Sequence, residues 1–301
     1  MPEGHTIHRL AAEHERRFAG RRLRASSPQG RFQEGAALID GRELTATEAH
    51  GKHLFLGFLG AEGAGPAEGA ELDEPATGAG WVHVHLGLIG RYDFGDPPAP
   101  GEQPPPPADT VRLRLEHPLA GHSDLRGPAL CTLITDAEKQ AVQQRLGPDP
   151  LRPADLAQDP ANDPDRAYRR ISRSRLPVAA LLLDQKVLAG VGNVYRAEVL
   201  FRHGLDPYLP GRQLPYETWQ SLWADLVALM HEGVELNRID TVRPEHTPEA
   251  MNRPPRQDDH GGEVYVYRRA GDPCLVCGTP VAHADLSGRN LFWCPTCQPK
   301  A

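Results

Sequence analysis

The chain of 301 residues lacks any run that approaches the roughly 18 consecutive apolar residues of a membrane-spanning helix. Its N-terminus also lacks the basic-then-apolar layout of a secretory signal. These two absences exclude a membrane-spanning protein and an exported protein, so we expect an intracellular enzyme or binding protein. The length predicts two domains.

Lysine is scarce, because it supplies only four of the 33 basic residues: Lys52, Lys139, Lys186 and Lys300. Such a bias toward arginine is typical of a GC-rich genome. A lysine that is retained under this bias is a candidate for chemistry that arginine cannot perform, above all proton transfer.

An overall excess of positive charge is also missing, since the net charge is −7. The signs are nevertheless segregated along the chain. Residues 166–213 carry nine Lys and Arg against three Asp and Glu, which is a local balance of +6. A protein that is acidic overall can hold a polyanion on such a basic segment, so the net charge does not exclude a nucleic-acid partner.

Only five cysteines are present, and four of them form two C-x-x-C pairs near the C-terminus: Cys274 with Cys277, and Cys294 with Cys297. Four thiolates in this spacing close a tetrahedral site, which predicts one structural zinc ion and no open position for catalysis. Two disulfides are the alternative, but nothing indicates export. The fifth cysteine, Cys131, is expected to be a small buried side chain.

Hydrophobic periodicity outlines the first half of the chain. Residues 5–18 predict an amphipathic helix, with Ile7, Leu10, Ala11 and Phe18 on one face. Strands are expected at three runs: 54–59, 81–86 and 111–115. The Gly-rich segment 60–80 and the Pro-rich segment 95–109 are expected to be loops.

The second half is expected to be helical. A short helix near 137–146 precedes the Pro- and Asp-rich segment 147–165, which predicts a domain boundary. Three further helices are expected after it: 178–184, 194–203 and 217–232. A strand-like unit with the four clustered cysteines follows, and its turn at 286–290 is expected to present Arg289.

A glycine-rich stretch, 187–193, separates two of these helices, and Asn193 is expected at the N-cap of the second. Either the asparagine only caps the helix, or the turn offers its backbone N–H groups to a phosphate. The arginines just upstream favour the second interpretation: Arg166, Arg169, Arg170, Arg173 and Arg175.

Pro2 follows the initiator methionine, and proline in this position permits removal of Met1. The mature chain would then begin with a secondary amine, which forms an iminium ion with an aldehyde or hemiacetal carbon without further activation. Glu3 beside it is suited to proton transfer. A reading without function is open as well, since many chains begin Met-Pro and have no such chemistry.

Together these features resemble the Fpg/Nei family of DNA glycosylases, which combine base excision with abasic-site lyase activity. The matching motifs run in family order along nearly the whole chain: Met1-Pro-Glu-Gly4, Gly51-Lys-His53, His85-Leu-Gly-Leu88, Leu146-Gly-Pro-Asp-Pro150, Asp184-Gln185, Gly190-Val-Gly-Asn-Val-Tyr195, and Gly288-Arg-Asn-Leu-Phe-Trp-Cys294 with Cys297-Gln298. The Pro-Glu-Gly-His opening is similar to the endonuclease VIII (Nei) branch. In detail the chain is most similar to the actinobacterial members of that branch.

The resemblance implies the catalytic residues. Pro2 would attack C1′ of the damaged nucleotide and displace the base, while Glu3 would act as general acid and base. Lys52 matches the family lysine that assists base loss and elimination. Elimination at the β and then the δ position would cut the strand on both sides of the lesion. The implied substrates are oxidised bases, and the Nei-like opening favours pyrimidines.

The resemblance also implies contacts to DNA. Asn193 and Arg289 would clamp the phosphates that flank the flipped nucleotide. Arg289 would also be one of the catalytic residues. His85 would add a contact to the DNA backbone. His83 and His85 on one strand face have other readings, as a metal pair or a packed polar pair.

A flipped base leaves a gap in the duplex that side chains fill. Leu88 matches the family's wedge position, and a core residue at a strand end is the alternative reading. Arg126 matches the arginine that reads the orphaned base. Here the chain departs from the formamidopyrimidine pattern, because Gly127-Pro128 stands where an aromatic residue is expected.

The implied fold class is α+β: an N-terminal β-sandwich with flanking helices, then a helix–two-turns–helix domain that ends in a four-cysteine zinc ribbon. The predicted domains are the catalytic sandwich at 1–150, the helical domain at 151–262 and the zinc finger at 263–301. The implied partner is damaged double-stranded DNA, with zinc but no small-molecule cofactor and no membrane. We expect a monomer in the bacterial cytoplasm, associated with the nucleoid.

Two other functions stay open. A formamidopyrimidine or 8-oxoguanine glycosylase would differ only in the base pocket, for which residues 234–262 are a candidate capping loop. A non-catalytic zinc-ribbon protein that binds nucleic acid would tolerate the loss of Pro2 and Glu3. A tautomerase with a proline base has no use for a zinc ribbon. The presence of all the catalytic positions favours the glycosylase.

Overall fold

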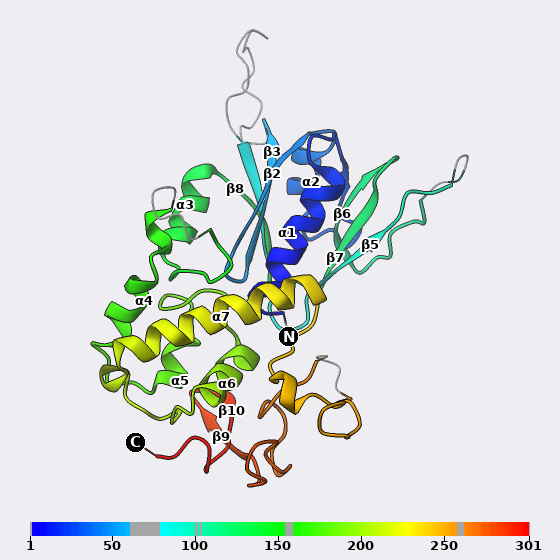
Figure 1. The fold of residues 1–301 in the computed structure, drawn as a ribbon. Helices are drawn as coiled ribbons and strands as arrows, with labels where there is room; N and C mark the ends of the chain where they lie inside the picture. Colours follow the sequence, from blue (N-terminus) through cyan, green and yellow to red (C-terminus); the bar gives the residue numbers. More distant parts are fainter. Residues whose placement is uncertain are drawn as a thin grey trace. The chain divides into compact units, whose positions relative to one another are not determined.

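The structure is a computed structural model, and it describes residues 2–60, 79–99, 102, 104–153, 159–257 and 262–300. Its contacts divide the chain into two units (Figure 1). Unit 1 comprises Met1–Pro2 and Ile7–Gln144, and unit 2 comprises Glu3–Thr6 and Arg145–Ala301. Residues 3–6 therefore pack with the second half of the chain. No helix among the described residues is long and apolar enough to cross a membrane.

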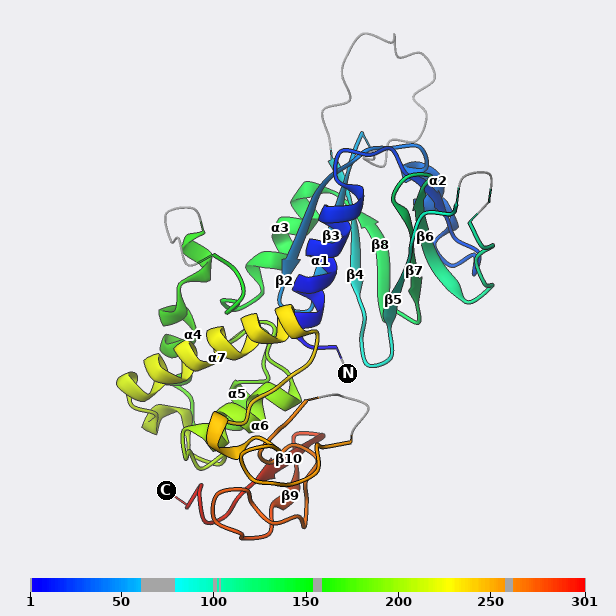
Figure 2. The same ribbon diagram turned by 45° about the vertical axis from the view of Figure 1, so that its right-hand side comes forward.

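Unit 1 is built from two four-stranded antiparallel sheets (Figure 2). The first has the order β2-β3-β4-β8: β2 (Leu44–His50), β3 (His53–Leu59), β4 (Ala79–His85) and β8 (Leu130–Ile134). The second has the order β1-β6-β7-β5: β1 (Arg24–Ser26), β6 (Val111–His117), β7 (Gly121–Arg126) and β5 (Arg91–Gly95). Apolar side chains of both sheets meet in one buried core, as in a β-sandwich.

In the described part of this half of the chain, three helices are formed: α1 (Gly4–Phe18), whose first residues belong to unit 2, α2 (Gln33–Ile39) and α3 (Asp136–Gln144). The predicted apolar face of α1 is confirmed, because all four of its residues are buried in the sandwich core. The strands expected at 54–59, 81–86 and 111–115 correspond to β3, β4 and β6. Most of the predicted loop at 60–80 lies outside the described residues.

The described residues of unit 2 contain four α-helices: α4 (Pro164–Ile171), α5 (Val178–Leu181), α6 (Asn193–Arg202) and α7 (Tyr216–Leu236). Short 3-10 helices lie at Pro160–Asn162, Gly211–Gln213 and Pro244–His246, and a hairpin is formed by β9 (Ala282–Leu286) and β10 (Arg289–Trp293). Helix α6 is the centre of the unit, since its residues 193–201 are all buried. Helix α7 ends at Leu236, and Asn237 after it takes the left-handed conformation common at helix ends.

Two predictions for this half need correction. Helix α5 ends at Leu181 instead of 184, and the chain goes on in turns. Helix α4 was not expected, because its start lies in the segment interpreted as a domain boundary. The local signal was present: Asp163 accepts the N–H of Asp165 as the N-cap, and Pro164 occupies the first helical position.

The imidazole of His14 makes unit 1 sensitive to acid. It is completely buried, donates from Nδ1 to the Leu10 carbonyl at 2.7 Å, and packs edge-on against Tyr92. Burial lowers the pKa of His14 from 6.5 to about 4. The unfolded chain takes up this proton near pH 6.5 and the folded chain only near pH 4. Stability is therefore complete above pH 6.5 and is lost as the pH falls from 6.5 to 4.

We expect His14 to cost about 2 kcal/mol of unfolding free energy between pH 7 and pH 5. Urea unfolding at the two pH values measures this cost. A His14→Leu variant, which fills the site without a titrating group, should show a smaller loss by that amount. The same pH dependence in the variant and the wild type would refute the assignment.

Candidate active site

The carboxylate of Glu3 lies at the N-terminus of α6, within unit 2. It accepts the backbone N–H groups of Gly192 at 2.9 Å, Val194 at 2.8 Å and Tyr195 at 3.4 Å, and it is completely buried. The first N–H groups of a helix have no partner inside the helix, and they attract negative charge. Glu3 therefore caps α6 from the other end of the sequence. Its backbone is joined directly to Pro2.

Two glycines make room for this contact. A Cβ on Gly192 would lie 2.3 Å from Cδ of Glu3, so the carboxylate reaches the helix only because residue 192 has no side chain. Gly190 has a φ of +86°, and its carbonyl accepts the N–H of Gly4 at 2.8 Å. The glycine-rich stretch thus serves to bring the start of the chain onto α6.

The prediction that Asn193 caps α6 is wrong. The N-cap is Gly192, and Asn193 is the first residue of the helix. The Nδ2 group of Asn193 donates instead to the carbonyl oxygen of Asn290 at 2.9 Å, near the start of strand β10. The capping group comes from Glu3, and a pattern confined to neighbouring residues cannot reveal a partner so distant in sequence.

Arg196 is a buried cation that the sequence analysis did not single out. Its Nη2 group donates to the Asn193 side chain and, at 2.7 Å, to the Asn290 carbonyl. Its Nε and Nη1 atoms have no hydrogen-bond partner among the described residues. Burial lowers the pKa of Arg196 to about 10. The negative charge of Glu3 raises this pKa, and the positive charge of Arg289 lowers it further. The spacing of one helical turn from Asn193 was the available signal.

The β9–β10 hairpin is formed as predicted, and it presents Arg289. Its two-residue loop, Ser287-Gly288, has φ values of 55° and 73°, which is the conformation that tight hairpins require. Arg289 is exposed at the start of β10. Asn290 follows Arg289 in the chain, and its carbonyl oxygen accepts hydrogen bonds from both Asn193 and Arg196. The hairpin therefore lies beside the N-terminal turn of α6.

The four clustered cysteines fit a zinc ion. Their sulfur atoms all lie within 4.8 Å of one another. Cys274 and Cys297 are 3.9 Å apart, and Cys277 and Cys294 are 3.4 Å apart. Tetrahedral zinc, with zinc–sulfur bonds of about 2.3 Å, separates its ligand atoms by about 3.8 Å. Within the described ranges, no other group of three or more His, Cys, Asp or Glu side chains has such a spacing.

Lys52, on the turn between β2 and β3, lies in a histidine-rich corner of unit 1. Nδ1 of His53 is 2.9 Å from Nε2 of His83, so one ring donates to the other. Burial lowers the pKa of His53 to about 3 and that of His83 to about 4, and the neighbouring imidazoles add to the effect. The pKa of His85 is lowered by burial and by the Lys52 charge. The hydrogen bond of His83 is made to His53 on the neighbouring strand, so neither reading of His83 as a pair with His85 is tested by it.

The turn between β4 and β5 exposes two aliphatic side chains. Leu88 is 57% exposed, which does not agree with its alternative reading as a core residue. Ile89 is 81% exposed and was not singled out from the sequence. Two adjacent apolar residues in a turn between strands were the signal that could have found it. Arg126, at the end of β7, forms ion pairs with Asp93 and Asp124.

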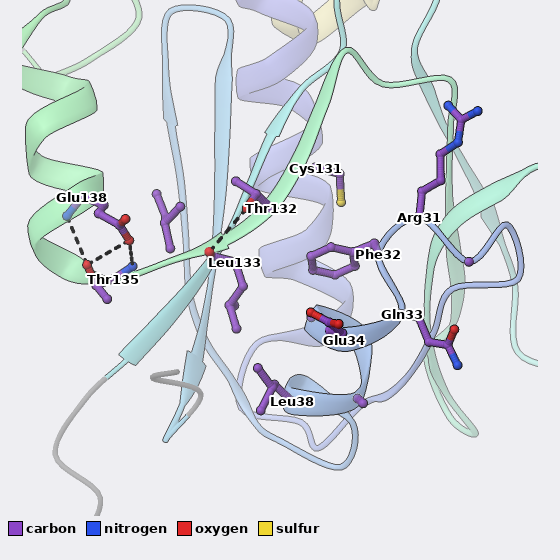
Figure 3. A pocket seen from close by; sticks show the side chains of 14 residues that line it. Arg31, Phe32, Gln33, Glu34, Leu38, Cys131, Thr132, Leu133, Thr135 and Glu138 are labelled. Carbon is purple, nitrogen blue, oxygen red and sulfur yellow. Dashed lines mark hydrogen bonds between the residues drawn. The ribbon is translucent and has the colours of Figure 1, made fainter. Parts of the chain in front are cut away.

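A cavity of about 950 Å³ lies between α2 and β8 in unit 1 (Figure 3). It is lined by Phe32, Leu38, Leu133 and Glu138, among others, and by none of the predicted catalytic residues. Cys131 faces it too. Burial raises the pKa of the Cys131 thiol to about 12. Its side chain was expected to be buried, and the structure shows it only partly buried.

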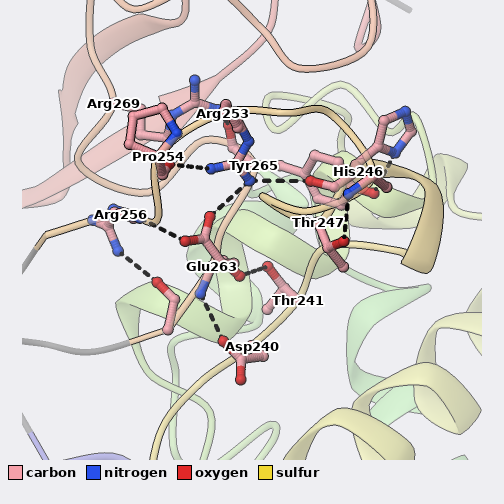
Figure 4. A network of polar contacts seen from close by, with 12 residues as sticks. Asp240, Thr241, His246, Thr247, Arg253, Pro254, Arg256, Glu263, Tyr265 and Arg269 are labelled. Carbon is pink, nitrogen blue, oxygen red and sulfur yellow. Dashed lines mark hydrogen bonds and ion pairs between the residues drawn. The ribbon is translucent and has the colours of Figure 1, made fainter.

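The segment after α7 is held by a polar network (Figure 4). The Glu263 carboxylate accepts the N–H of Arg256 at 2.6 Å and pairs with Arg253 at 2.7 Å, while the Glu263 N–H donates to Asp240. The Tyr265 hydroxyl accepts the N–H of Arg243. The described part of the candidate capping loop at 234–262 is therefore a folded segment, and its role toward a base stays a prediction.

Comparisons with known proteins agree with this arrangement along the whole chain. Three family profiles match in order: the formamidopyrimidine-DNA glycosylase N-terminal domain at residues 1–129, the formamidopyrimidine-DNA glycosylase H2TH domain at 146–244, and the zinc finger found in FPG and IleRS at 271–300.

Individual relatives are similar over comparable lengths. Endonuclease 8 1 of Mycobacterium tuberculosis (strain H37Rv) is 48% identical over 301 residues, which cover 99% of this chain and 100% of the relative. Probable endonuclease 8 2 of Streptomyces coelicolor is 33% identical over 99% of this chain and 94% of its own length. The crystal structure of the MutM (Fpg) protein of Thermus thermophilus matches with a TM-score of 0.68 at 27% identity, and both chains are covered completely.

Proposed function

Because the chain belongs to the family of formamidopyrimidine-DNA glycosylases and endonucleases 8, we propose that it is the bifunctional DNA glycosylase and abasic-site lyase that excises oxidised pyrimidines. Family membership makes it a DNA glycosylase with lyase activity that acts in base excision repair, and it confirms the α+β fold class. The similarity to endonuclease 8 proteins over the full length supports pyrimidine lesions.

In the proposed reaction the Pro2 nitrogen, released by removal of Met1, attacks C1′ of the damaged nucleotide. The bond between C1′ and the base breaks, and the base leaves with a proton. The sugar ring opens to an iminium ion that joins C1′ to Pro2. Loss of the C2′ proton expels the 3′ phosphate, and a second elimination expels the 5′ phosphate. Hydrolysis of the iminium then frees the amine.

The observation that carries this proposal is the place of Glu3. Its carboxylate is buried and fixed by three backbone N–H groups, and it directly follows the residue that supplies the nucleophile. A fixed carboxylate next to the reacting sugar can give and take protons without losing orientation. The same contacts cap α6, so the catalytic role of the carboxylate is what the proposal adds to its structural one.

Other residues are proposed to assist or to bind DNA. Lys52 assists base loss and elimination, and His85 contacts the DNA backbone from the same corner of unit 1. Asn193 and Arg289 bind the phosphates on either side of the flipped nucleotide. The hydrogen bond from Asn193 to the carbonyl of Asn290, the residue after Arg289, supports this pairing. Leu88 fills the gap in the duplex, and its exposure supports this role.

The domain bounds, the oligomeric state and the location of the protein are further parts of the proposal. We take the domains to be 1–150, 151–262 and 263–301, and the protein to act as a monomer, without a small-molecule cofactor or a membrane, on damaged duplex DNA. One zinc ion is held by Cys274, Cys277, Cys294 and Cys297. The cytoplasm and the nucleoid are the proposed location, because the substrate is chromosomal DNA.

Cleavage of an end-labelled duplex with a single 5,6-dihydrouracil tests the proposed function. We expect a labelled product that ends in a 3′ phosphate, the mark of β- and δ-elimination. A matched duplex with 8-oxoguanine opposite cytosine should be cut at least tenfold more slowly. Faster cutting of 8-oxoguanine would support the formamidopyrimidine alternative instead. Binding without cutting of either duplex would support the non-catalytic binding protein.

Arg196→Ala is expected to weaken DNA binding by about 10- to 100-fold. The guanidinium joins the Asn193 side chain to the Asn290 carbonyl, and hydrogen bonds from a charged group contribute roughly 1.5–3 kcal/mol. Without the guanidinium, the proposed phosphate-binding side chains Asn193 and Arg289 are no longer fixed relative to each other. Fluorescence anisotropy with abasic duplex measures the change. Both bonds come from Nη2 alone, and a lysine ammonium carries several donors on one nitrogen, so Arg196→Lys should bind more tightly than Arg196→Ala. Wild-type affinity in Arg196→Ala would contradict the assignment.

A further inference from the structure

We propose that unit 2 carries a second DNA site: a basic face that binds the backbone phosphates of a further DNA segment while a damaged duplex is held near Glu3. The choice of DNA as the ligand rests on the proposed function, because an enzyme bound to one part of a chromosome works beside other DNA. The cations that form the face, and their lack of acidic partners, come from the fold of unit 2 alone.

The basic face is assembled from three segments of unit 2. Arg170, in the last turn of α4, donates from Nη1 to the carbonyl oxygen of Lys186, in the turn that follows α5. The N–H of Arg212, in the 3-10 helix before α7, donates to the carbonyl oxygen of Ser174 at 2.8 Å. These contacts bring together five exposed cations, which we call the basic face: Arg170, Arg173, Arg175, Lys186 and Arg212.

Four of these cations have no acidic partner. Within the described ranges, no ion pair or hydrogen bond is formed by the side chains of Arg173, Arg175, Lys186 and Arg212. Two carboxylates contact the same segments, and both have local partners: Asp163 pairs with Arg169 at 3.0 Å, and Asp184 accepts the backbone N–H of Lys186 at 2.9 Å. The basic face therefore keeps an excess of positive charge.

Exposed arginines elsewhere in the chain are paired with carboxylates. Arg91 pairs with Asp93 at 3.2 Å and Arg238 pairs with Asp240 at 2.6 Å, although both arginine side chains are more than half exposed. The chain has 40 acidic residues against 33 Lys and Arg, so carboxylates are not scarce. Four neighbouring cations without a carboxylate partner depart from this pattern, and they indicate an anion from outside the chain.

The basic face lies at the end of α6 that is remote from Glu3. Glu3 caps the N-terminus of α6, whereas Val178 and Ala179 donate to the carbonyls of Leu209 and Pro207, in the segment that follows the C-terminus of this helix. The ten residues of α6 separate its two ends by about 15 Å. The two ends of this buried helix face different sides of unit 2, so the basic face is suited to a second DNA segment and not to the damaged nucleotide.

Duplex DNA is the anion that this face fits. Cations that displace counterions from the phosphate backbone bind DNA independently of its sequence. A guanidinium group also pairs with phosphate through two N–H donors, and three of the four unpartnered cations are arginines. Contacts to four phosphates would weaken binding about 100-fold as the salt concentration rises from about 50 to about 200 mM. An enzyme with both sites can pass from one DNA segment to another without leaving DNA.

The test asks whether one protein molecule holds two duplexes. A biotinylated duplex with a tetrahydrofuran abasic analogue is fixed on beads and loaded with protein, and a fluorescent duplex without damage is then added at about 50 mM salt. We expect the wild type to retain the fluorescent duplex in proportion to bound protein. The basic-face variant, with Arg173→Gln, Arg175→Gln and Arg212→Gln, should bind the fluorescent duplex at least about tenfold more weakly. Its affinity for the immobilised duplex should equal that of the wild type.

The matched control removes the same charge from exposed arginines of unit 1, with Arg21→Gln, Arg24→Gln and Arg31→Gln. It should retain the fluorescent duplex as the wild type does. No retention by the wild type, or equal retention by the two triple variants, would overturn the proposal. So would a loss of affinity of the basic-face variant for the immobilised duplex, because the arginines would then belong to the first site. Retention of single-stranded RNA in place of the duplex would show that the ligand class is wrong.

Borohydride trapping on an abasic duplex separates these results from a failure of the proposed function. Trapping without retention of the second duplex would keep the chemistry and reject the second site. If the beads captured no protein, the proposed function would fail, and titration of the undamaged duplex with the wild type and the basic-face variant would still decide the question. Weaker binding by that variant alone would support the site, and equal binding would reject it.

Discussion

Glu3→Gln is expected to lower the rate of base excision by about 10²- to 10⁴-fold, the usual loss when a positioned proton-transfer group is removed. The amide cannot take up or give the proton that ring opening and base departure require. It also turns N–H groups toward a helix end that already offers only N–H groups, at Gly192 and Val194. Single-turnover excision of 5,6-dihydrouracil measures the chemical step directly.

Glu198→Gln is the matched control. Glu198 lies on α6, the helix that Glu3 caps, and its carboxylate is buried. It likewise accepts three backbone N–H groups, from Tyr265, Val266 and Tyr267 at 2.7–2.9 Å. The control should lose stability as Glu3→Gln does, but keep the single-turnover rate of its folded fraction. If both variants lost the same rate, Glu3 would be a helix cap and not a catalytic group.

Removal of zinc is expected to weaken DNA binding by at least 100-fold and to abolish strand cleavage. The hairpin that presents Arg289 has only two strands, and an isolated two-stranded hairpin is at best marginally stable in water. Structural zinc sites supply folding free energy of about 10 kcal/mol or more. Without the ion we expect the ribbon to unfold and to release Asn290 from Asn193 and Arg196. Treatment with 1,10-phenanthroline, followed by anisotropy with abasic duplex, measures this effect.

The non-chelating isomer 1,7-phenanthroline is the control, and one equivalent of added zinc should restore binding. Cys294→Ser should reproduce the loss without a chelator, since Cys294 is completely buried and is one of the four clustered sulfur ligands. Protein that has demonstrably lost its zinc yet binds DNA with unchanged affinity would rule out the structural role.

Local patterns were sufficient for the parts of this molecule whose geometry is set by neighbouring residues. The spacing of Cys274, Cys277, Cys294 and Cys297 predicts their cluster, because each pair forms a knuckle within four residues. The Ser287-Gly288 loop predicts its hairpin for the same reason. The amphipathic face of α1 follows from its periodicity.

Contacts between distant segments could not be predicted in this way. The cap of α6 comes from Glu3, 189 residues before Gly192, and no pattern around either residue reveals it. The engagement of Arg126 likewise depends on strand pairing, which places Asp93 and Asp124 opposite each other on β5 and β7. Resemblance to a family supplied roles for individual residues that neither periodicity nor spacing could have assigned.

We propose that the amine of Pro2 is the nucleophile. We would test it by borohydride trapping on a duplex with one abasic site, for the wild type and for Pro2→Gly, with the linked peptide identified by mass spectrometry. We expect a covalent protein–DNA band in the wild type, with the sugar joined to the N-terminal nitrogen of a chain that begins at Pro2, and loss of the band in the variant. A link to Lys52, or an undiminished band from Pro2→Gly, would contradict it.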